Sequence, residues 1–182
     1  PLENAESLSM LSQILVAGNE TTAASMTEGI WLLTKNPEQY ELIKKDPSPE
    51  IISNFVEEVL RYSSPSSNMF RRATKDVEMH GIKIPKDSIL FARFASANQD
   101  GEKFPDPYKF DITRENLKDQ VAFGKGVHHC LGAALSRREM NIGFRVIFER
   151  LENFRLSEGA PPPEFSANAL LHGLTGLQID FD

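Results

Sequence analysis

The sequence predicts a mainly α-helical fold with small β-sheets, and three features support this α+β class. Apolar or small residues recur at helical spacing from about residue 5 to residue 34. Two further segments each begin with a polar residue followed by a proline, a combination that starts helices. Short alternating stretches between residues 77 and 94 are typical of strands joined by turns. We therefore expect helices, a small sheet, an irregular segment, a helix and a second small sheet.

The long first helix has poor helix-forming sequence in its middle, where residues 17–22 read Ala-Gly-Asn-Glu-Thr-Thr. Glycine loosens the backbone, and threonine hydroxyls compete for carbonyls four residues back. We therefore predict a kink at these residues.

The next two helices are expected to run from Pro37 to about residue 46 and from Pro49 to about residue 62, where Pro65 follows. Strands are expected at residues 77–79, 82–84 and 89–94, separated by turns. Residues 98–129 show little periodicity, and such a long irregular segment inside a domain is usually functional. A helix over about residues 131–151 and a strand at residues 177–181 complete the pattern.

Composition narrows the functional classes. The chain has 182 residues, enough for one domain with a sizeable core. The formal net charge of −6 argues against binding to nucleic acid, and no apolar run reaches the roughly 18 residues of a membrane span. A single cysteine excludes an internal disulfide. The chain begins at Pro1 without a signal-peptide pattern, and we expect it to be cut from a longer protein.

The only cysteine, Cys130, lies between a glycine-rich turn and the expected start of a helix; residues 123–132 read Phe-Gly-Lys-Gly-Val-His-His-Cys-Leu-Gly. Backbone N–H groups and the helix dipole stabilise a thiolate at such a position. The residues alone leave open a buried structural cysteine, a zinc site with His128 and His129, and a cysteine protease. The zinc site is the weaker hypothesis because structural zinc sites normally need four ligands. The cysteine protease is weaker still, because its histidine lies across a cleft from the cysteine, whereas His128 and His129 lie beside Cys130 in the sequence.

The pattern Phe-Gly-x-Gly-x-His-x-Cys-Leu-Gly closely resembles the heme-binding loop of the cytochrome P-450 superfamily. The resemblance implies that Cys130 is the thiolate ligand of a heme iron, a ligand that favours O–O cleavage. It also implies that Arg71 and His128 bind the heme propionates. The full set of implied heme-binding residues is Ala17, Arg71, Phe123, Gly124, Gly126, His128, Cys130 and Gly132.

Glu58 and Arg61 form a Glu-x-x-Arg pair on one helix face. Taken alone, such a pair is usually a solvated salt bridge worth well under ~1 kcal/mol. The resemblance implies instead that the pair locks with Arg114, from the Phe-Asp-x-x-Arg sequence at residues 110–114. Its implied role is structural, because the three side chains would hold the loop that carries Cys130.

Residues 17–22 resemble the oxygen-activation motif of the same family, although polar residues in a helix often mark only a local bend. The resemblance implies that Thr21 hydrogen-bonds O2 and that Glu20 helps to relay protons. By alignment with the family, the substrate-facing residues are Val16, Ala17, Ser66, Ser67, Met69, Leu170 and Leu171. Simple core packing explains each of them equally well, and together they suggest a mostly apolar pocket.

The chain, residues 1–182, is thus identified as the heme-binding C-terminal part of a single cytochrome P-450 domain of the soluble bacterial type. The N-terminal half of that domain is expected to be absent. The resemblance implies a monooxygenase that uses heme b and O2 to oxidise a mostly apolar small organic substrate. Electrons would come from NAD(P)H through a ferredoxin or flavodoxin, in the cytoplasm. Lys125, Arg137 and Arg138 are candidates for a cationic docking patch, although a solvated helix face explains the arginines equally well.

Two alternatives stay open. One is a peroxide-driven peroxygenase on the same fold, against which Glu20 and Thr21 argue because such enzymes can dispense with a proton relay. The other is non-enzymatic, namely a heme-thiolate sensor or a heme-free interaction fragment.

Overall fold

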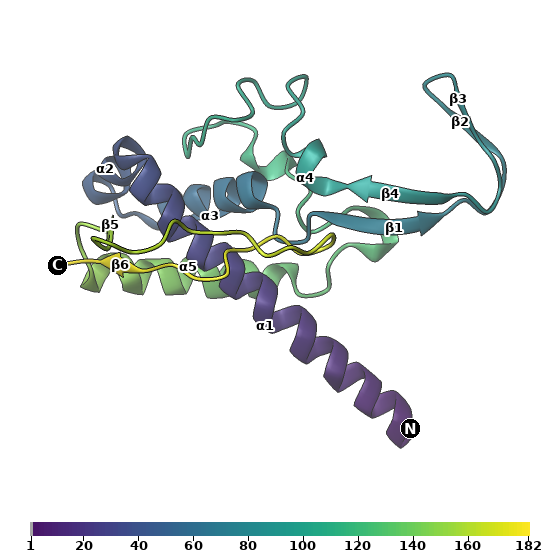
Figure 1. Ribbon diagram of the computed structural model, residues 1–182, viewed down its shortest axis with the longest axis horizontal. Coiled ribbons are helices and arrows are strands. Elements are labelled where there is room, and N and C mark those ends of the chain that lie inside the picture. The colour runs from purple at the N-terminus through teal and green to yellow at the C-terminus, as the bar shows by residue number, and fades with distance from the viewer. Residues whose placement is uncertain (1) are drawn as a thin grey trace.

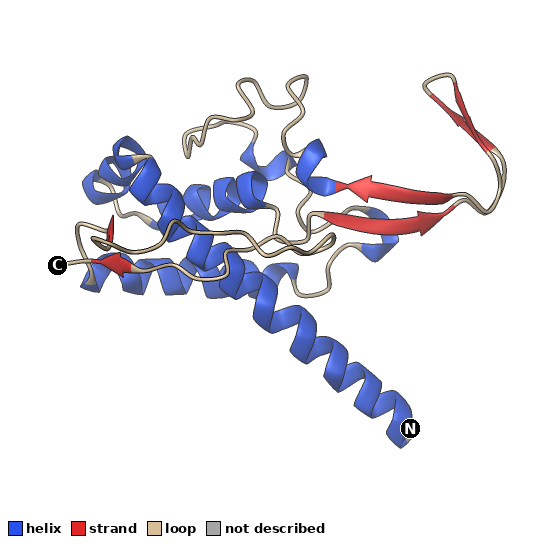
Figure 2. Cartoon of the chain, viewed as in Figure 1, coloured by secondary structure: helices blue, strands red, loops and turns tan. Residues whose placement is uncertain are grey.

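The computed structural model describes residues 2–182 and confirms a mainly α-helical fold with small sheets (Figure 2). The helices are α1 (Asn4–Lys35), α2 (Pro37–Lys45), α3 (Pro49–Ser63), α4 (Phe94–Ala97) and α5 (Ala133–Arg150), with single 3-10 turns η1 (Leu117–Asp119) and η2 (Gly126–His128). The strands are β1 (Asn68–Arg72), β2 (Val77–Met79), β3 (Ile82–Ile84), β4 (Ile89–Arg93), β5 (Arg155–Leu156) and β6 (Ile179–Asp180). In this part of the chain, none of the helices combines the length and apolar character needed to cross a membrane.

The first helix, α1, is uninterrupted from Asn4 to Lys35, so the predicted kink at residues 17–22 was wrong. The Thr21 hydroxyl does donate to the Ala17 carbonyl, at 2.8 Å, but this bond is accommodated within the helical ladder. Figure 1 shows the first half of α1 projecting away from the other elements. Its apolar side chains are exposed, and Leu15, for example, is 71% exposed. The second half packs against α3 and α5.

Both proline-started helices form as predicted. Ser48 caps α3 by accepting a hydrogen bond from the Ile51 N–H at 3.4 Å. The helix ends where Ser64 adopts a left-handed backbone conformation, with φ of 47°, directly before Pro65. Helix α3, which carries Glu58 and Arg61, therefore has a well-defined start and end.

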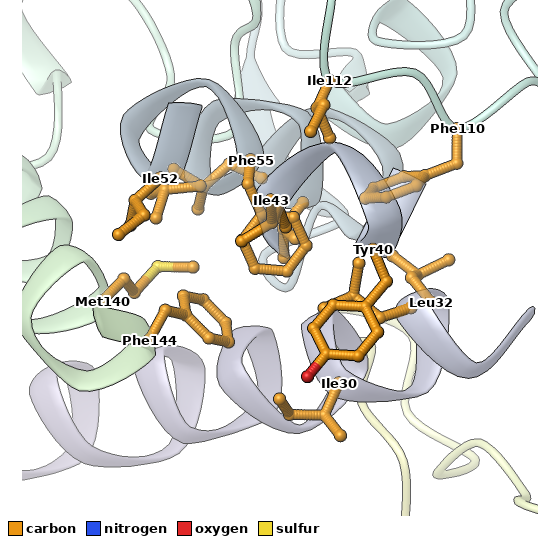
Figure 3. Close-up of a cluster of buried hydrophobic side chains, with 14 of the residues drawn as sticks. Ile30, Leu32, Tyr40, Ile43, Ile52, Phe55, Phe110, Ile112, Met140 and Phe144 are labelled. Carbon is orange, nitrogen blue, oxygen red and sulfur yellow. The ribbon is translucent and has the colours of Figure 1, made fainter. Parts of the chain in front are cut away.

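The hydrophobic core lies between α1, α2, α3 and α5 (Figure 3). Phe55 of α3 is fully buried at its centre, with its ring 4.7 Å from Phe144 and 6.1 Å from Phe110 in edge-to-face arrangements. Such aromatic pairs contribute beyond their burial of apolar area. Because α1, α3 and α5 all meet here, the core fixes the relative positions of the helices that carry the site.

Gly29 of α1 makes the close approach of α1 to α5 possible. A Cβ atom added at Gly29 would lie 2.6 Å from Phe144 Cζ and 3.3 Å from Phe55 Cζ. We expect Gly29→Ala to destabilise the protein by about 1–3 kcal/mol, because overpacking forces buried rings to move. Chemical denaturation measures this change, with Gly18→Ala as a control since nothing lies within 4 Å of Gly18. Equal stability of the two variants would contradict the prediction.

Three two-stranded antiparallel sheets complete the fold. Strand β1 pairs with β4 from Asn68↔Arg93 to Arg72↔Ile89. This strand was not predicted, because its mostly exposed residues show no alternation. The β2–β3 pair forms the expected hairpin, and β5 pairs with β6. Residues 164–175, which we call the C-terminal loop, fold back on themselves and contact the segment after α3 through a Ser66↔Leu171 bridge.

Candidate functional site

Cys130 lies between η2 and α5, and its side chain is exposed, so residues 2–182 do not bury it as a structural cysteine. Its backbone N–H donates to the Phe123 carbonyl at 2.9 Å, and its own carbonyl accepts from the Ala133 N–H at 3.2 Å. Helix α5 begins at Ala133, slightly later than predicted. Main-chain bonds therefore fix the thiol just ahead of the N-terminus of α5.

The cysteine loop, residues 121–132, needs its two internal glycines. Gly124 and Gly126 have φ values of 69° and 78°, a region that other residues rarely adopt. His129, which had no predicted role, donates from Nδ1 to the Gly124 carbonyl at 3.1 Å and closes the same turn. In residues 2–182 no cluster of three or more His, Cys, Asp or Glu side chains could hold a metal, so the zinc alternative lacks a ligand set.

Cys130 forms part of the wall of a cavity of about 680 Å³. The middle of α1, strand β1, the cysteine loop and the C-terminal loop all contribute to this Cys130 cavity. The predicted site residues on its wall are Val16, Ala17, Thr21, Ser66, Met69, Arg71, Phe123, Gly124, His128, Cys130 and Leu171. The fold thus brings together residues that are up to 155 positions apart, from Val16 to Leu171.

Five of the residues predicted for heme binding, substrate binding or proton relay lie off this wall: Glu20, Ser67, Gly126, Leu170 and Gly132. Glu20 lines a second cavity of about 530 Å³, and Thr21 lies on both walls. Adjacent residues on a helix point about 100° apart, which explains this division. Ser67 is instead bonded to Leu170, whose carbonyl accepts from the Ser67 N–H at 3.0 Å. Gly132 caps α5 next to the thiol.

Two arginines of β1, Arg71 and Arg72, line the Cys130 cavity, together with His128. Arg72 is engaged with Asp87 at 3.0 Å, whereas the guanidinium of Arg71 donates only to the carbonyl of the preceding residue, at 2.8 Å. Arg71 is therefore the freer of the two arginines to bind an anionic group.

Glu58 and Arg61 are both fully buried and form a bidentate pair, with Nε–Oε2 at 2.6 Å and a second bond at 2.8 Å. Arg114 does reach this pair, with its Nε 3.3 Å from Glu58 Oε1. Arg61 also donates to the carbonyls of Asn98, Pro107 and Lys109. The cluster therefore anchors the irregular segment to α3, because two buried cations satisfy carbonyls that no strand or helix pairs.

Glu57, next to Glu58, anchors the cysteine loop in the same way, and the sequence analysis did not single it out. Its carboxylate accepts from Arg137 Nε at 2.6 Å and from the Gln120 amide at 3.0 Å. The Arg137 guanidinium lies over the Phe123 ring, 4.6 Å from its centroid. Arg137 thus links α3 and α5 to the loop, and it is not a free cation for docking a partner.

Several wall residues have no counterpart in the motifs. Ser25, Leu60, Phe94 and Ser136 line the Cys130 cavity. Ser136 of α5 shares a hydrogen bond of 3.1 Å with Thr22 of α1, so the two helices that flank the cavity are joined directly. The spacing of 114 residues leaves no local signal for this contact.

Comparison with known proteins decides the family. The Cytochrome P450 family model matches residues 49–180. The chain belongs to the cytochrome P450 family. Cytochrome P450 CYP107DY1 of Priestia megaterium is 38% identical over 99% of this chain and 43% of its own length. The 6-deoxyerythronolide B hydroxylase of Saccharopolyspora erythraea is 34% identical over 93% of the chain and 41% of its own length.

Solved cytochrome P450 structures share the fold. CYP109Q5 from Chondromyces apiculatus superimposes with a TM-score of 0.90 at 35% identity, over 99% of this chain and 45% of that one. CYP109E1 from Bacillus megaterium, in complex with testosterone, gives 0.91 at 32% identity, over 98% and 48%. The chain therefore spans less than half the length of these relatives. The predicted family and its fold are both confirmed.

The cytochrome P450 family implies a heme cofactor, and the Cys130 cavity fits one. An exposed thiol faces a wall in which apolar side chains predominate, as the two faces of a flat apolar macrocycle require. Arg71 and His128 on the same wall suit the negative propionates. Gly132, where a Cβ would lie 3.9 Å from the thiol, adds no side chain beside the ligand atom.

Proposed function

We propose that the protein containing this chain is a heme-thiolate monooxygenase that oxidises a mostly apolar small organic substrate. The observation that carries the proposal is that Cys130 and Thr21, 109 positions apart, lie on the wall of one cavity. Heme b held by Cys130 supplies the iron that activates O2, so that one oxygen atom enters the substrate and the other forms water. Relatives named as hydroxylases support this reaction class.

The chain's own residues provide binding and proton transfer. Cys130 provides the thiolate ligand, while Arg71 and His128 bind the propionates by charge-assisted hydrogen bonds. Glu58, Arg61 and Arg114 keep the cysteine loop in place.

The Thr21 hydroxyl carries a proton on Oγ1, and in the structure it donates a hydrogen bond to the Ala17 carbonyl at 2.8 Å. Rotation of the side chain breaks this hydrogen bond and makes the hydroxyl proton available. Glu20, on the second cavity, passes protons toward Thr21, because Thr21 is common to both cavities.

Apolar wall residues define the substrate class. Val16, Met69 and Leu171 line the Cys130 cavity together with Ser66. Ser67, which follows Ser66, donates both its N–H and its hydroxyl to the Leu170 carbonyl and so joins this segment to the C-terminal loop. The exposed apolar side chains of the first half of α1 are covered by the remainder of the longer protein.

Two electrons per turnover come from NAD(P)H through a ferredoxin or flavodoxin in the bacterial cytoplasm. Lys125 and Arg138 are exposed near Cys130 and serve as the docking cations, whereas Arg137 is held by Glu57. Electrostatic steering of this kind weakens with salt. Reduction of the protein by a ferredoxin system is therefore slower at high ionic strength.

The central experiment is the spectrum of the reduced, CO-bound full-length protein. Thiolate ligation is expected to give a red-shifted Soret band, whereas a histidine-type spectrum would disprove the proposal. Turnover with peroxide but none with a ferredoxin system would assign the protein to the peroxygenases instead.

Replacement of Thr21 tests the proton relay. In Thr21→Ala we expect product formation to fall by about 100-fold while NAD(P)H consumption continues, because the proton donor on the cavity wall is lost. Thr27→Ala is a matched control, since Thr27 makes the same hydrogen bond to a carbonyl four residues back, at 2.9 Å, but lies off the Cys130 cavity. Intact coupling in Thr21→Ala would show that the relay assignment is wrong.

A further inference from the structure

Four buried polar atoms without hydrogen-bond partners gather where the C-terminal loop meets α1 and the end of α3. They are Glu28 Oε1, Trp31 Nε1, Ser63 Oγ and His172 Nδ1, the only such side-chain atoms found in residues 2–182. Glu28 is only 2% exposed. Buried polar groups are almost always paired, so the unpaired carboxyl oxygen of Glu28 and the His172 nitrogen beside it call for a physical explanation.

His172 is the charged or titratable group that faces Glu28. Its Nδ1 lies 3.8 Å from Glu28 Oε1, just beyond hydrogen-bond distance. The end of α3 contributes the Ser63 hydroxyl, which is uncharged, and α5 contributes the Phe144 ring beside Gly29. In this part of the chain Glu28 therefore has no arginine or lysine to balance a negative charge.

The His172 ring is held in place by stacking. It lies on Phe165, with ring centroids 4.1 Å apart, and Phe165 in turn meets the Trp31 ring edge-on at 5.7 Å. The loop backbone also lies directly on α1, because a Cβ at Gly173 would be 2.9 Å from Ala24 Cβ. The stacking thus holds the ring, whose side chain is 41% exposed, with its buried Nδ1 atom beside the Glu28 carboxyl group.

The protonation states favour one shared proton. Burial raises the pKa of Glu28 to about 7, and the Ser63 hydroxyl opposes this only in part. Burial lowers the pKa of His172, partly offset by the Ser63 backbone. Below neutral pH, a protonated Glu28 carboxyl therefore faces the His172 Nδ1 atom across 3.8 Å, and no buried carboxylate is left unpaired.

We propose that Glu28 and His172 form a proton-sharing pair that locks the C-terminal loop onto α1 and so positions Leu171 in the wall of the Cys130 cavity. Leu171 adjoins His172 and pairs with Ser66, while the His172 N–H donates to the Pro65 carbonyl at 2.8 Å. Loosening the loop moves the cavity wall. This consequence for a bound substrate rests on the proposed function, whereas the pairing itself does not.

The pair makes loop closure depend on pH. Because the pKa of Glu28 is raised in the closed state, closure is favoured most below the ordinary value of 4.5. This stabilisation is lost as the pH rises to about 7 and stays constant above that. If opening restores the ordinary pKa, ionisation of Glu28 alone increases the opening equilibrium about tenfold between pH 6 and pH 8. The lowered pKa of His172 acts in the opposite direction, because the open state binds a proton more readily at pH 6, so the net increase is smaller.

Amide hydrogen exchange in the full-length protein tests the proposal without depending on heme. After correction for intrinsic rates, the amides of His172, Ser166 and Thr175 should exchange faster at pH 8 than at pH 6, by up to about tenfold. Glu28→Gln, which cannot ionise, should abolish that difference. Glu164→Gln, at an exposed carboxyl in the same loop, should retain it. An unchanged pH dependence in Glu28→Gln, or none in the wild type, would overturn the proposal.

A second variant tests the imidazole. His172→Phe keeps the stacking on Phe165 but removes the Nδ1 atom that faces Glu28, so exchange at pH 6 should rise by about fivefold, as expected for the loss of one polar interaction. Exchange equal to that of the wild type would exclude the pairing. The CO spectrum of the same samples reports the proposed function separately, because neither variant touches Cys130.

Discussion

Cys130→Ser is expected to abolish the thiolate-type CO spectrum and all monooxygenase activity while leaving the fold intact. A serine hydroxyl does not supply the thiolate that the proposed iron ligation needs. The fold should survive because the Cys130 side chain is exposed and its two hydrogen bonds, to Phe123 and Ala133, are made by the main chain. Serine preserves both. The free energy of unfolding of the apoprotein should change by no more than about 0.5 kcal/mol.

Absorbance spectroscopy of the reduced, CO-bound protein measures the first effect, and denaturation of the apoprotein measures the second. Val127→Ser is a suitable control, because Val127 is also exposed on the same loop, at 96%, but lies off the cavity wall. That variant should keep the thiolate-type spectrum. A thiolate-type spectrum in Cys130→Ser would show that another residue binds the iron.

Arg61→Met is expected to destabilise the protein by about 3–5 kcal/mol, because it leaves the buried carboxylate of Glu58 without its principal partner. Arg61 has no exposed surface and makes two hydrogen bonds to Glu58 and three to carbonyls of the irregular segment. Arg114 alone, 3.3 Å from the carboxylate, cannot replace those contacts. Loss of this anchor is expected to loosen residues 98–109 and to reduce heme content.

Urea unfolding of the purified variants measures the loss. Lys44→Met provides the comparison, because Lys44 and Glu41 form an exposed pair on α2 and removing it should cost less than about 1 kcal/mol. Arg61→Lys should recover little stability, since an ammonium group cannot make the bidentate contact. If Arg61→Met were as stable as Lys44→Met, the cluster would not be the anchor that its geometry indicates.

Local sequence determined much of this protein. Helix caps and prolines set the starts of α2 and α3, because a cap and its first turn involve only neighbouring residues. The cysteine loop was equally readable, since Gly124 and Gly126 stand where the chain needs positive φ. The Glu58–Arg61 pair follows from helical spacing alone. The prediction of a kink in α1 failed because local propensity is only a weak constraint on backbone conformation.

Only the tertiary structure decided which side chains meet. The contacts of Glu57 with Arg137, of Thr22 with Ser136 and of Glu28 with His172 join residues 80, 114 and 144 positions apart. No periodicity encodes such distances, because each partner depends on how α1, α3 and α5 pack around Phe55. The same packing put Thr21 on both cavities but Glu20, its neighbour in sequence, on only the second. Burial, which gives the Glu28 carboxyl its raised pKa, likewise exists only after the chain has folded.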